Sequence, residues 1–137
     1  MTAGGYDYQG RRVRRQVFAW NTGSAAWSTS PESDMRFVYD GWRVIMELDC
    51  LACGAGCATG ECGTGVSPVK RKYTWGWDLA GQNGQPNSLE SAGGIGGLLA
   101  AYDTAGPTTT SDDRTFLYFY DANGNVGQLI EPTGGRG

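Results

Sequence analysis

The sequence predicts an all-β protein, an antiparallel meander of about seven or eight short strands, and two observations support this fold class. Apolar residues recur at spacing two, the period of a strand, and no window longer than a few residues holds the i, i+3, i+4, i+7 pattern of an amphipathic helix. The 137 residues also include 23 glycines and 12% aromatic residues, a composition typical of tight turns and of large side chains on flat surfaces. This length suits a single domain, residues 1–137.

The predicted strands lie between clusters of turn-forming residues. Clusters such as Asn21-Thr22-Gly23, Asp40-Gly41 and Ala122-Asn123-Gly124 have the chemistry of hairpin turns. Strands joined by such short turns pair antiparallel, so the elements fit one meander. The strands are expected at residues 13–20, 25–28, 35–39, 43–49, 69–77, 95–102, 115–120 and 125–130.

The charge of the chain indicates no nucleic-acid partner and no membrane insertion. A formal net charge of -3 offers nothing to attract nucleic acid or an anionic membrane surface. The basic run at Arg11, Arg12, Arg14 and Arg15 divides between the two faces of a strand, which favours solvated arginines that protect an edge strand. The longest weakly polar stretch, residues 92–102, is interrupted by four glycines and is far shorter than a spanning helix.

One frame, Tyr-Asp-x-x-Gly, occurs twice in the sequence. Its aspartate can accept hydrogen bonds from backbone amides further along the turn, and its glycine can take the left-handed conformation that ends a turn with a bulge. Such hairpins cannot bury their own faces and usually stack into extended arrays. The full copies are Tyr6, Asp7 and Gly10, then Tyr120, Asp121 and Gly124, and the shorter echoes are Tyr39-Asp40-Gly41 and Tyr102-Asp103.

Five stretches of the chain follow one another as similar stretches do in a known family. They are YDYQGRRVRRQVF, RFVYDGWRVIMELD, YTWGWDLAG, AGGIGGLLAAYD and FLYFYDANGNVGQLI. On these motifs the chain resembles the Rhs/YD-repeat proteins over nearly its whole length, except about residues 50–68. That family includes bacterial Rhs proteins, the shell components of insecticidal Tc toxins and the teneurins, whose repeats form one long sheet that spirals into a hollow shell.

The resemblance implies a structural, non-catalytic module. It would be part of a shell around a toxin cargo, or a self-associating extracellular or cell-surface assembly, including a head-to-tail, filament-like one. Its sheet edges would pair with the remainder of a YD-repeat shell or with a second copy. The family's C-terminal core, with its Asp-Pro-x-Gly-x-x-Gly motif and the aspartates linked to self-cleavage, has no match here, so no autoprotease is expected. We expect no cleavable secretion signal at the N-terminus, because residues 1–5 have no cationic stretch followed by an apolar run.

Four cysteines lie within thirteen residues, at Cys50, Cys53, Cys57 and Cys62, in a predicted loop insertion at about residues 50–68. Their thiolates could surround a structural zinc ion, although spacings of two, three and four residues do not reproduce paired C-x2-C hooks. Two disulfides could equally fasten the loop in an oxidising compartment, and free thiols are the third alternative. No cofactor other than a structural zinc is expected.

The sequence indicates a protein that is not an enzyme. It contains no histidine, which excludes Ser-His-Asp and Cys-His arrangements, histidine-bound zinc and histidine general bases. Most carboxylates are expected in turns or at strand ends, where aspartate bonds the backbone. The carboxylates considered are Asp34, Asp40, Glu47, Asp49, Asp78, Glu90, Asp103, Asp112, Asp113 and Asp121.

The tryptophans support the main alternative function, a carbohydrate-binding surface. Aromatic side chains can stack on sugar rings when they are exposed, but on a sheet they more often stabilise cross-strand packing. Packing is the favoured interpretation for the whole set, which comprises Trp20, Trp27, Trp42, Trp75, Trp77 and Tyr73. The residues considered for glycan stacking are Trp42, Trp75 and Trp77.

Overall fold

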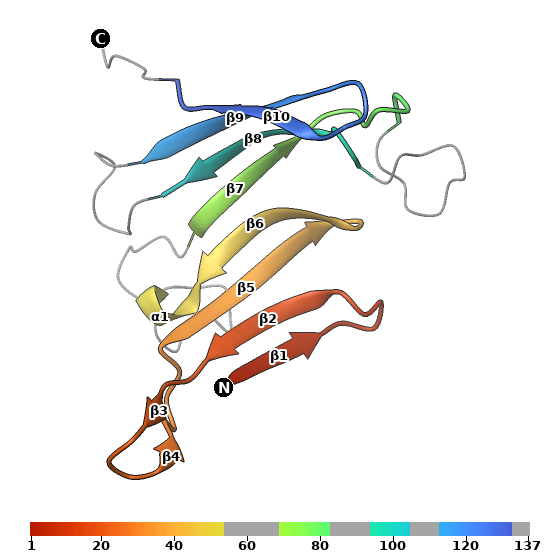
Figure 1. Ribbon diagram of the computed structural model, residues 1–137. Helices are drawn as coiled ribbons and strands as arrows, with labels where there is room; N and C mark the ends of the chain where they lie inside the picture. Colours follow the sequence, from red (N-terminus) through yellow and green to blue (C-terminus); the bar gives the residue numbers. More distant parts are fainter. Residues whose placement is uncertain (54–68, 83–93, 105–112, 133–137) are drawn as a thin grey trace.

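The computed structural model describes residues 1–53, 69–82, 94–104 and 113–132, and the predicted all-β meander is confirmed. Eight strands form one antiparallel sheet, with each strand beside its predecessor in the chain once a small inserted hairpin is set aside (Figure 1). The strands, in sheet order, are β1 (Thr2–Tyr6), β2 (Arg12–Val17), β5 (Ser33–Asp40), β6 (Arg43–Asp49), β7 (Val69–Trp75), β8 (Leu98–Asp103), β9 (Arg114–Tyr120) and β10 (Val126–Ile130).

One helical turn, α1 (Cys50–Cys53), follows β6, and the rest of the predicted cysteine insertion, residues 54–68, lies outside the described residues. The amide of Leu51 donates to Asp49 Oδ1 at 3.0 Å, which satisfies a donor at the start of this turn. Within the described ranges, no helix has the length and apolar character needed to cross a membrane.

The connections of the meander alternate between two rims of the sheet. Figure 1 shows the turns after β1, β5, β7 and β9 at one rim, and α1 with the inserted hairpin at the other. We call the first of these the turn rim; it contains residues 7–11, 41–42, 76–82 with 94–97, and 121–125. Both full copies of the Tyr-Asp-x-x-Gly frame therefore lie at the same rim.

The inserted hairpin corrects the expected strand at residues 13–20. The chain leaves the main sheet after Val17, and β3 (Trp20–Asn21) pairs with β4 (Ala26–Trp27) in a separate two-stranded sheet. Asn21 Oδ1 accepts from the amides of Gly23 and Ser24 at 2.9 and 3.2 Å, which closes this turn locally. The expected strand at 25–28 is thus outside the eight-stranded meander, and the Trp20 and Trp27 rings pack edge to face at 5.0 Å.

Strand β1 was not expected, because Gly4 and Gly5 have low strand propensity. It forms because its backbone pairs with β2 from Thr2 to Tyr6. A Cβ on Gly4 would lie 3.3 Å from Cε2 of Tyr6, so the glycine leaves room for that ring above the strand. The strand expected at residues 95–102 starts later, at Leu98. Residues 95–97 belong to a turn instead, because Gly94 and Gly96 have φ angles of 89° and 76°.

The residues that the structure describes form a single-layer sheet with almost no hydrophobic core. In the part of the chain that the structure describes, the buried apolar side chains are Cys50 and Ala101, at 6% and 1% exposure. The carboxylate of Asp34 is also buried, and Arg14 Nε and Gln16 Nε2 donate to it at 2.9 and 3.1 Å. Stability therefore depends on backbone ladders and on contacts between neighbouring strands.

We predict that Gly124→Ala destabilises the fold more than Gly10→Ala. Both glycines have left-handed φ angles, of 81° and 78°, so each change strains the backbone by about 1 kcal/mol. A Cβ at 124 would also lie 2.5 Å from Cγ2 of Ile95 and 2.6 Å from Cδ1 of Leu79, whereas a Cβ at 10 meets nothing within 4 Å. We expect a further loss of about 1 kcal/mol at 124, measured by urea unfolding; equal losses would contradict this packing.

Candidate functional site

The first Tyr-Asp-x-x-Gly frame closes its turn through the aspartate. Asp7 Oδ1 accepts from the backbone amides of Gln9 and Arg11 at 2.9 and 3.0 Å, and the Gly10 amide donates to the Asp7 carbonyl at 3.0 Å. Burial acts to raise the pKa of Asp7, but hydrogen bonds from the Arg11 guanidinium and from the amides outweigh it and lower that pKa. The aspartate is therefore an ionised backbone acceptor, as the sequence predicted.

The second frame has the same geometry. Asp121 Oδ1 accepts from the amides of Asn123 and Asn125, each at 2.9 Å, and the Gly124 amide donates to the Asp121 carbonyl at 3.0 Å. The side-chain amide of Asn125 takes the place of Arg11 and donates to Asp121 Oδ2 at 2.9 Å. This hydrogen bond is the main cause of the lowered pKa of Asp121.

A third copy of the turn, which the sequence analysis missed, starts at Asp78. Asp78 Oδ1 accepts from the amides of Ala80 and Gln82 at 3.0 Å, the Gly81 amide donates to the Asp78 carbonyl at 2.9 Å, and Gly81 has a φ of 68°. The Asp-x-x-Gly spacing was present as a signal, but tryptophan rather than tyrosine precedes this aspartate.

The two shorter echoes are not copies of this turn. Tyr39-Asp40-Gly41 ends β5 at a two-residue hairpin loop, in which Gly41 has a φ of 59° and Trp42 follows. Tyr102-Asp103 ends β8 at the rim opposite the turn rim, and Asp103 forms an ion pair with Arg71 of the adjacent strand at 2.5 Å. Of these two echoes, only the first contributes a residue, Tyr39, to the position that repeats among the hairpins of the turn rim.

Four hairpins reach the turn rim and share one register. In each, an aromatic residue at the end of the first strand faces a residue at the start of the second, and one bulged residue follows before the ladder resumes. We call the hairpins β1–β2, β5–β6, β7–β8 and β9–β10 units 1 to 4. The facing pairs are Tyr6 with Arg12, Tyr39 with Val44, Trp75 with Leu98, and Tyr120 with Val126, and the bulged residues are Val13, Ile45, Leu99 and Gly127.

The aromatic residue of each later unit donates a hydrogen bond to the unit before it. The acceptor is always the backbone carbonyl of the residue that faces the previous aromatic side chain. The three bonds are Tyr39 Oη to the Arg12 carbonyl at 2.9 Å, Trp75 Nε1 to the Val44 carbonyl at 2.8 Å, and Tyr120 Oη to the Leu98 carbonyl at 2.8 Å. These bonds tie neighbouring units together along the turn rim.

A hollow of about 420 Å³ opens on the sheet beside these aromatic side chains. Phe37, Tyr39 and Trp75 contribute aromatic lining, and Glu47 and Tyr73 contribute polar groups. Tyr73 Oη donates to Glu47 Oε1 at 2.6 Å, so these two polar groups already bind each other. The hollow has the aromatic lining of a small-molecule site, and Tyr6 and Arg12 also line it.

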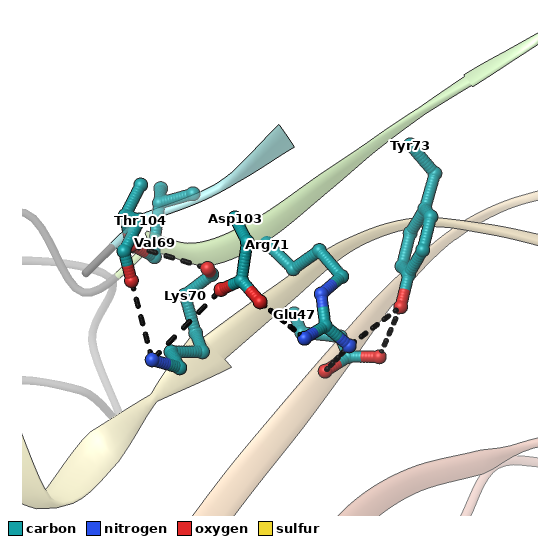
Figure 2. Close-up of polar contacts among 7 residues, drawn as sticks. All are labelled: Glu47, Val69, Lys70, Arg71, Tyr73, Asp103 and Thr104. Atoms are coloured by element: carbon teal, nitrogen blue, oxygen red, sulfur yellow. Dashed lines mark hydrogen bonds and ion pairs between the residues drawn. The ribbon is translucent and has the colours of Figure 1, made fainter. Parts of the chain in front are cut away.

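A charged cluster crosses three strands next to the hollow (Figure 2). Arg71 of β7 lies between Asp103 of β8, at 2.5 Å, and Glu47 of β6, at 4.0 Å, and Lys70 lies 3.9 Å from Asp103. Burial, followed by the hydrogen bond to Glu47, raises the pKa of Tyr73 to about 12, against the opposing effect of Arg71. The hydrogen bonds from Arg71 to Asp103 and Tyr73 raise the pKa of Arg71. The cluster joins strands β6, β7 and β8 through the Arg71 guanidinium.

Cys50 is buried and disulfide-bonded, at the junction between β6 and α1. Cys53 ends α1, and Cys57 and Cys62 lie outside the described residues. Within the described residues no three His, Cys, Asp or Glu side chains converge as a metal site. The choice between two disulfides and a structural zinc for the whole set stays a prediction, as do the roles of Glu90 and Asp112, which are also outside the described ranges.

The tryptophans considered for glycan stacking differ in exposure. Trp42 and Trp77 are 50% and 76% exposed at the turn rim, and Tyr8 in the first turn is 92% exposed. Trp75 is half-buried; its indole N–H donates to the Val44 carbonyl on the preceding strand β6, and the Arg43 guanidinium lies 5.8 Å from its ring centroid. Two of the three rings are thus open to a partner.

The comparisons with known proteins identify no relatives. No family model, no curated protein and no solved structure matches this chain. The Rhs/YD-repeat resemblance therefore rests on the sequence motifs.

We predict that Arg71→Met destabilises the protein far more than Arg114→Met. Removing Arg71 leaves Glu47 and Asp103, which are about three-quarters buried or more, without their shared cation, at a cost of about 2 kcal/mol. Arg114 pairs with Glu131 at 2.5 Å, but its side chain is 57% exposed, so its loss should cost about 0.5 kcal/mol. Urea unfolding of both variants measures the difference, and similar losses would show that the cluster does not hold the sheet.

Proposed function

We propose that the chain is a structural, non-catalytic β-sheet module of YD-repeat type that builds part of a larger wall or self-associating assembly. The observation that carries this proposal is the coreless single layer. A sheet that buries only two apolar side chains among its described residues gains stability mainly by adding strands at its edges. Each added unit would bring a backbone ladder and one aromatic hydrogen bond of the kind that joins units 1 to 4.

The two edge strands support lateral growth. Edge strand β10 has all five residues exposed, and neither it nor edge strand β1 contains a charged residue or a proline within its bounds. Lysine, proline and inward-pointing charges are the usual protection against edge-to-edge pairing. The remaining protection of each edge strand is a register irregularity near its turn. The other exposed positions of the edge strands can accept a further strand.

The carboxylates support a structural role. Asp7, Asp78 and Asp121 cap turns, and Asp34 and Asp103 bind arginines of neighbouring strands. Hydrogen bonds of this kind lower the pKa of Asp7, Asp34 and Asp121, so these three carboxylates favour the ionised form and are poor general acids. Placement at the cell surface or outside the cell, and a toxin cargo behind the wall, are parts of the proposal that rest on the family resemblance.

Self-association through the edges predicts a specific mutational pattern. Leu129→Lys places a charge on the outermost strand, and we expect it to raise the dissociation constant of the assembly about tenfold or more. Val38→Lys is the matched control, because Val38 is also exposed but lies on the interior strand β5. Sedimentation velocity over a wide concentration range measures both; a chain that is monomeric throughout would contradict the proposal.

A carbohydrate-binding surface is the second candidate, favoured by the exposed rings of Trp42 and Trp77 at one rim. For this function, a glycan array should identify a ligand, and the double change Trp42→Ala with Trp77→Ala should weaken its binding at least about tenfold. Trp20→Ala, in the hairpin at the opposite rim, is the control. Binding that survives the double change, or no binding at all, would eliminate this candidate.

A further inference from the structure

The units are joined in the same register beside each aromatic donor. At each junction, one residue donates the aromatic hydrogen bond and another residue accepts it through its carbonyl. The residue two positions after the acceptor then pairs with the residue three positions before the donor. The pairs are Arg14 with Arg36, Met46 with Lys72, and Ala100 with Leu117. Next to the aromatic donor, the three junctions thus have the same strand pairing and the same side-chain hydrogen bond, although one donor is an indole and two are phenols. Further from the donor, the β6–β7 ladder shifts register between Glu47 and Leu48.

The outer halves of this junction remain at the two edges of the sheet. Tyr6 occupies the position of Tyr39, Trp75 and Tyr120, but among the described residues no strand lies on the outer side of β1. Its hydroxyl accepts from Arg12 Nη2 and Nε at 3.3 and 3.4 Å, and its side chain is 58% exposed. No hydrogen bond donated by this hydroxyl occurs in the described part of the chain, whereas the equivalent tyrosines both donate.

The opposite edge supplies the matching acceptor. Val126 occupies the position of Arg12, because each lies six residues after the tyrosine of a full Tyr-Asp-x-x-Gly frame. The Arg12 carbonyl accepts the aromatic donor of unit 2, and the carbonyl of Val126 is the same acceptor at the outer side of unit 4. The two edges therefore carry complementary halves of one junction.

We propose that the partner of edge strand β1 is β10 of a second copy of this chain, and that Tyr6 of one copy donates to the Val126 carbonyl of the other. This inference rests on the proposed function and adds the partner and the register. The repeated rule pairs Ala3 with Gln128, and from there Thr2 with Leu129. The geometry is the same as at the three junctions within the chain.

Strand direction and charge agree with this pairing. Eight antiparallel strands leave β10 antiparallel to β1, so a copy displaced along the sheet continues the alternation without a break. Eight strands spaced about 4.8 Å apart give a repeat of roughly 38 Å along such an array. Neither edge strand carries a charged side chain, so no like charges would face each other across the junction. The contact is head-to-tail, and it extends into a linear array unless the twist closes a ring.

The test of the hydrogen bond compares two tyrosines in the full chain. Tyr6→Phe removes the donor, and we expect the dissociation constant from sedimentation velocity to rise about three- to tenfold, as the loss of one hydrogen bond predicts. Tyr8→Phe is the control, because Tyr8 lies in the same turn and is 92% exposed but is not at the junction position. Urea unfolding at a concentration where the chain is monomeric shows whether either change alters the fold itself.

The test of the register is a disulfide between copies. Directly opposed residues of an antiparallel pair have Cα atoms about 4.5–5.5 Å apart, within the range of a disulfide. The double variant Ala3→Cys with Gln128→Cys should therefore oxidise to a covalent ladder, with the 3–128 linkage identified by peptide mass mapping. The double variant Ala3→Cys with Gly127→Cys places the second cysteine one residue out of register and should give far less covalent ladder. Ala3→Cys alone is a second control, because it reveals pairing between two β1 strands.

The pairing is overturned if Tyr6→Phe and Tyr8→Phe associate equally well, or if the 3–128 linkage does not form. When the chain still associates in that case, through two like edges or through its faces, the proposed structural function survives and the junction assigned here is wrong. A chain that is monomeric under all conditions overturns both.

Discussion

The hydrogen bond from an aromatic side chain to the carbonyl of the preceding unit is the contact on which the sheet depends. A single layer has no second layer to fix the positions of its strands, so register must be set within the sheet. Each unit sets its internal register by a turn and a bulge, and the donors Tyr39, Trp75 and Tyr120 fix it to the previous unit. The turn geometry within each unit and the register between neighbouring units are thus both set at the turn rim.

The near absence of a core explains where the remaining stabilising contacts lie. Because few side chains are removed from water on both sides, hydrophobic burial contributes less here than in a two-layer domain of equal length. Polar contacts across strands take a larger share: Arg14 with Asp34, and Arg71 with Asp103 and Glu47. These pairs lie at interior junctions of the sheet, partly shielded from solvent, where ion pairs are stronger than at a fully exposed surface.

The use of polar side chains for structural contacts also bears on function. Groups that resemble catalytic parts in the sequence, such as the many aspartates, are committed to capping turns or to pairing with arginines. What the molecule leaves open is its edge backbone and the exposed rings of the turn rim. The proposed structural role depends on both of these surfaces.

The sequence by itself determined the strand period, the antiparallel class and the chemistry of the turns at Asp7 and Asp121, because these depend on residues a few positions apart. It did not identify β1, whose glycines form a strand only because β2 lies beside them. It also took Tyr102-Asp103 for an echo of the frame, whereas Trp75 occupies the repeated position and Asp103 serves an ion pair. Those assignments follow from the pairing of β7 with β6 and β8, which brings together residues that are about 30 positions apart in the chain. Only the tertiary structure decides such contacts, since local propensity carries no information about which strands become neighbours.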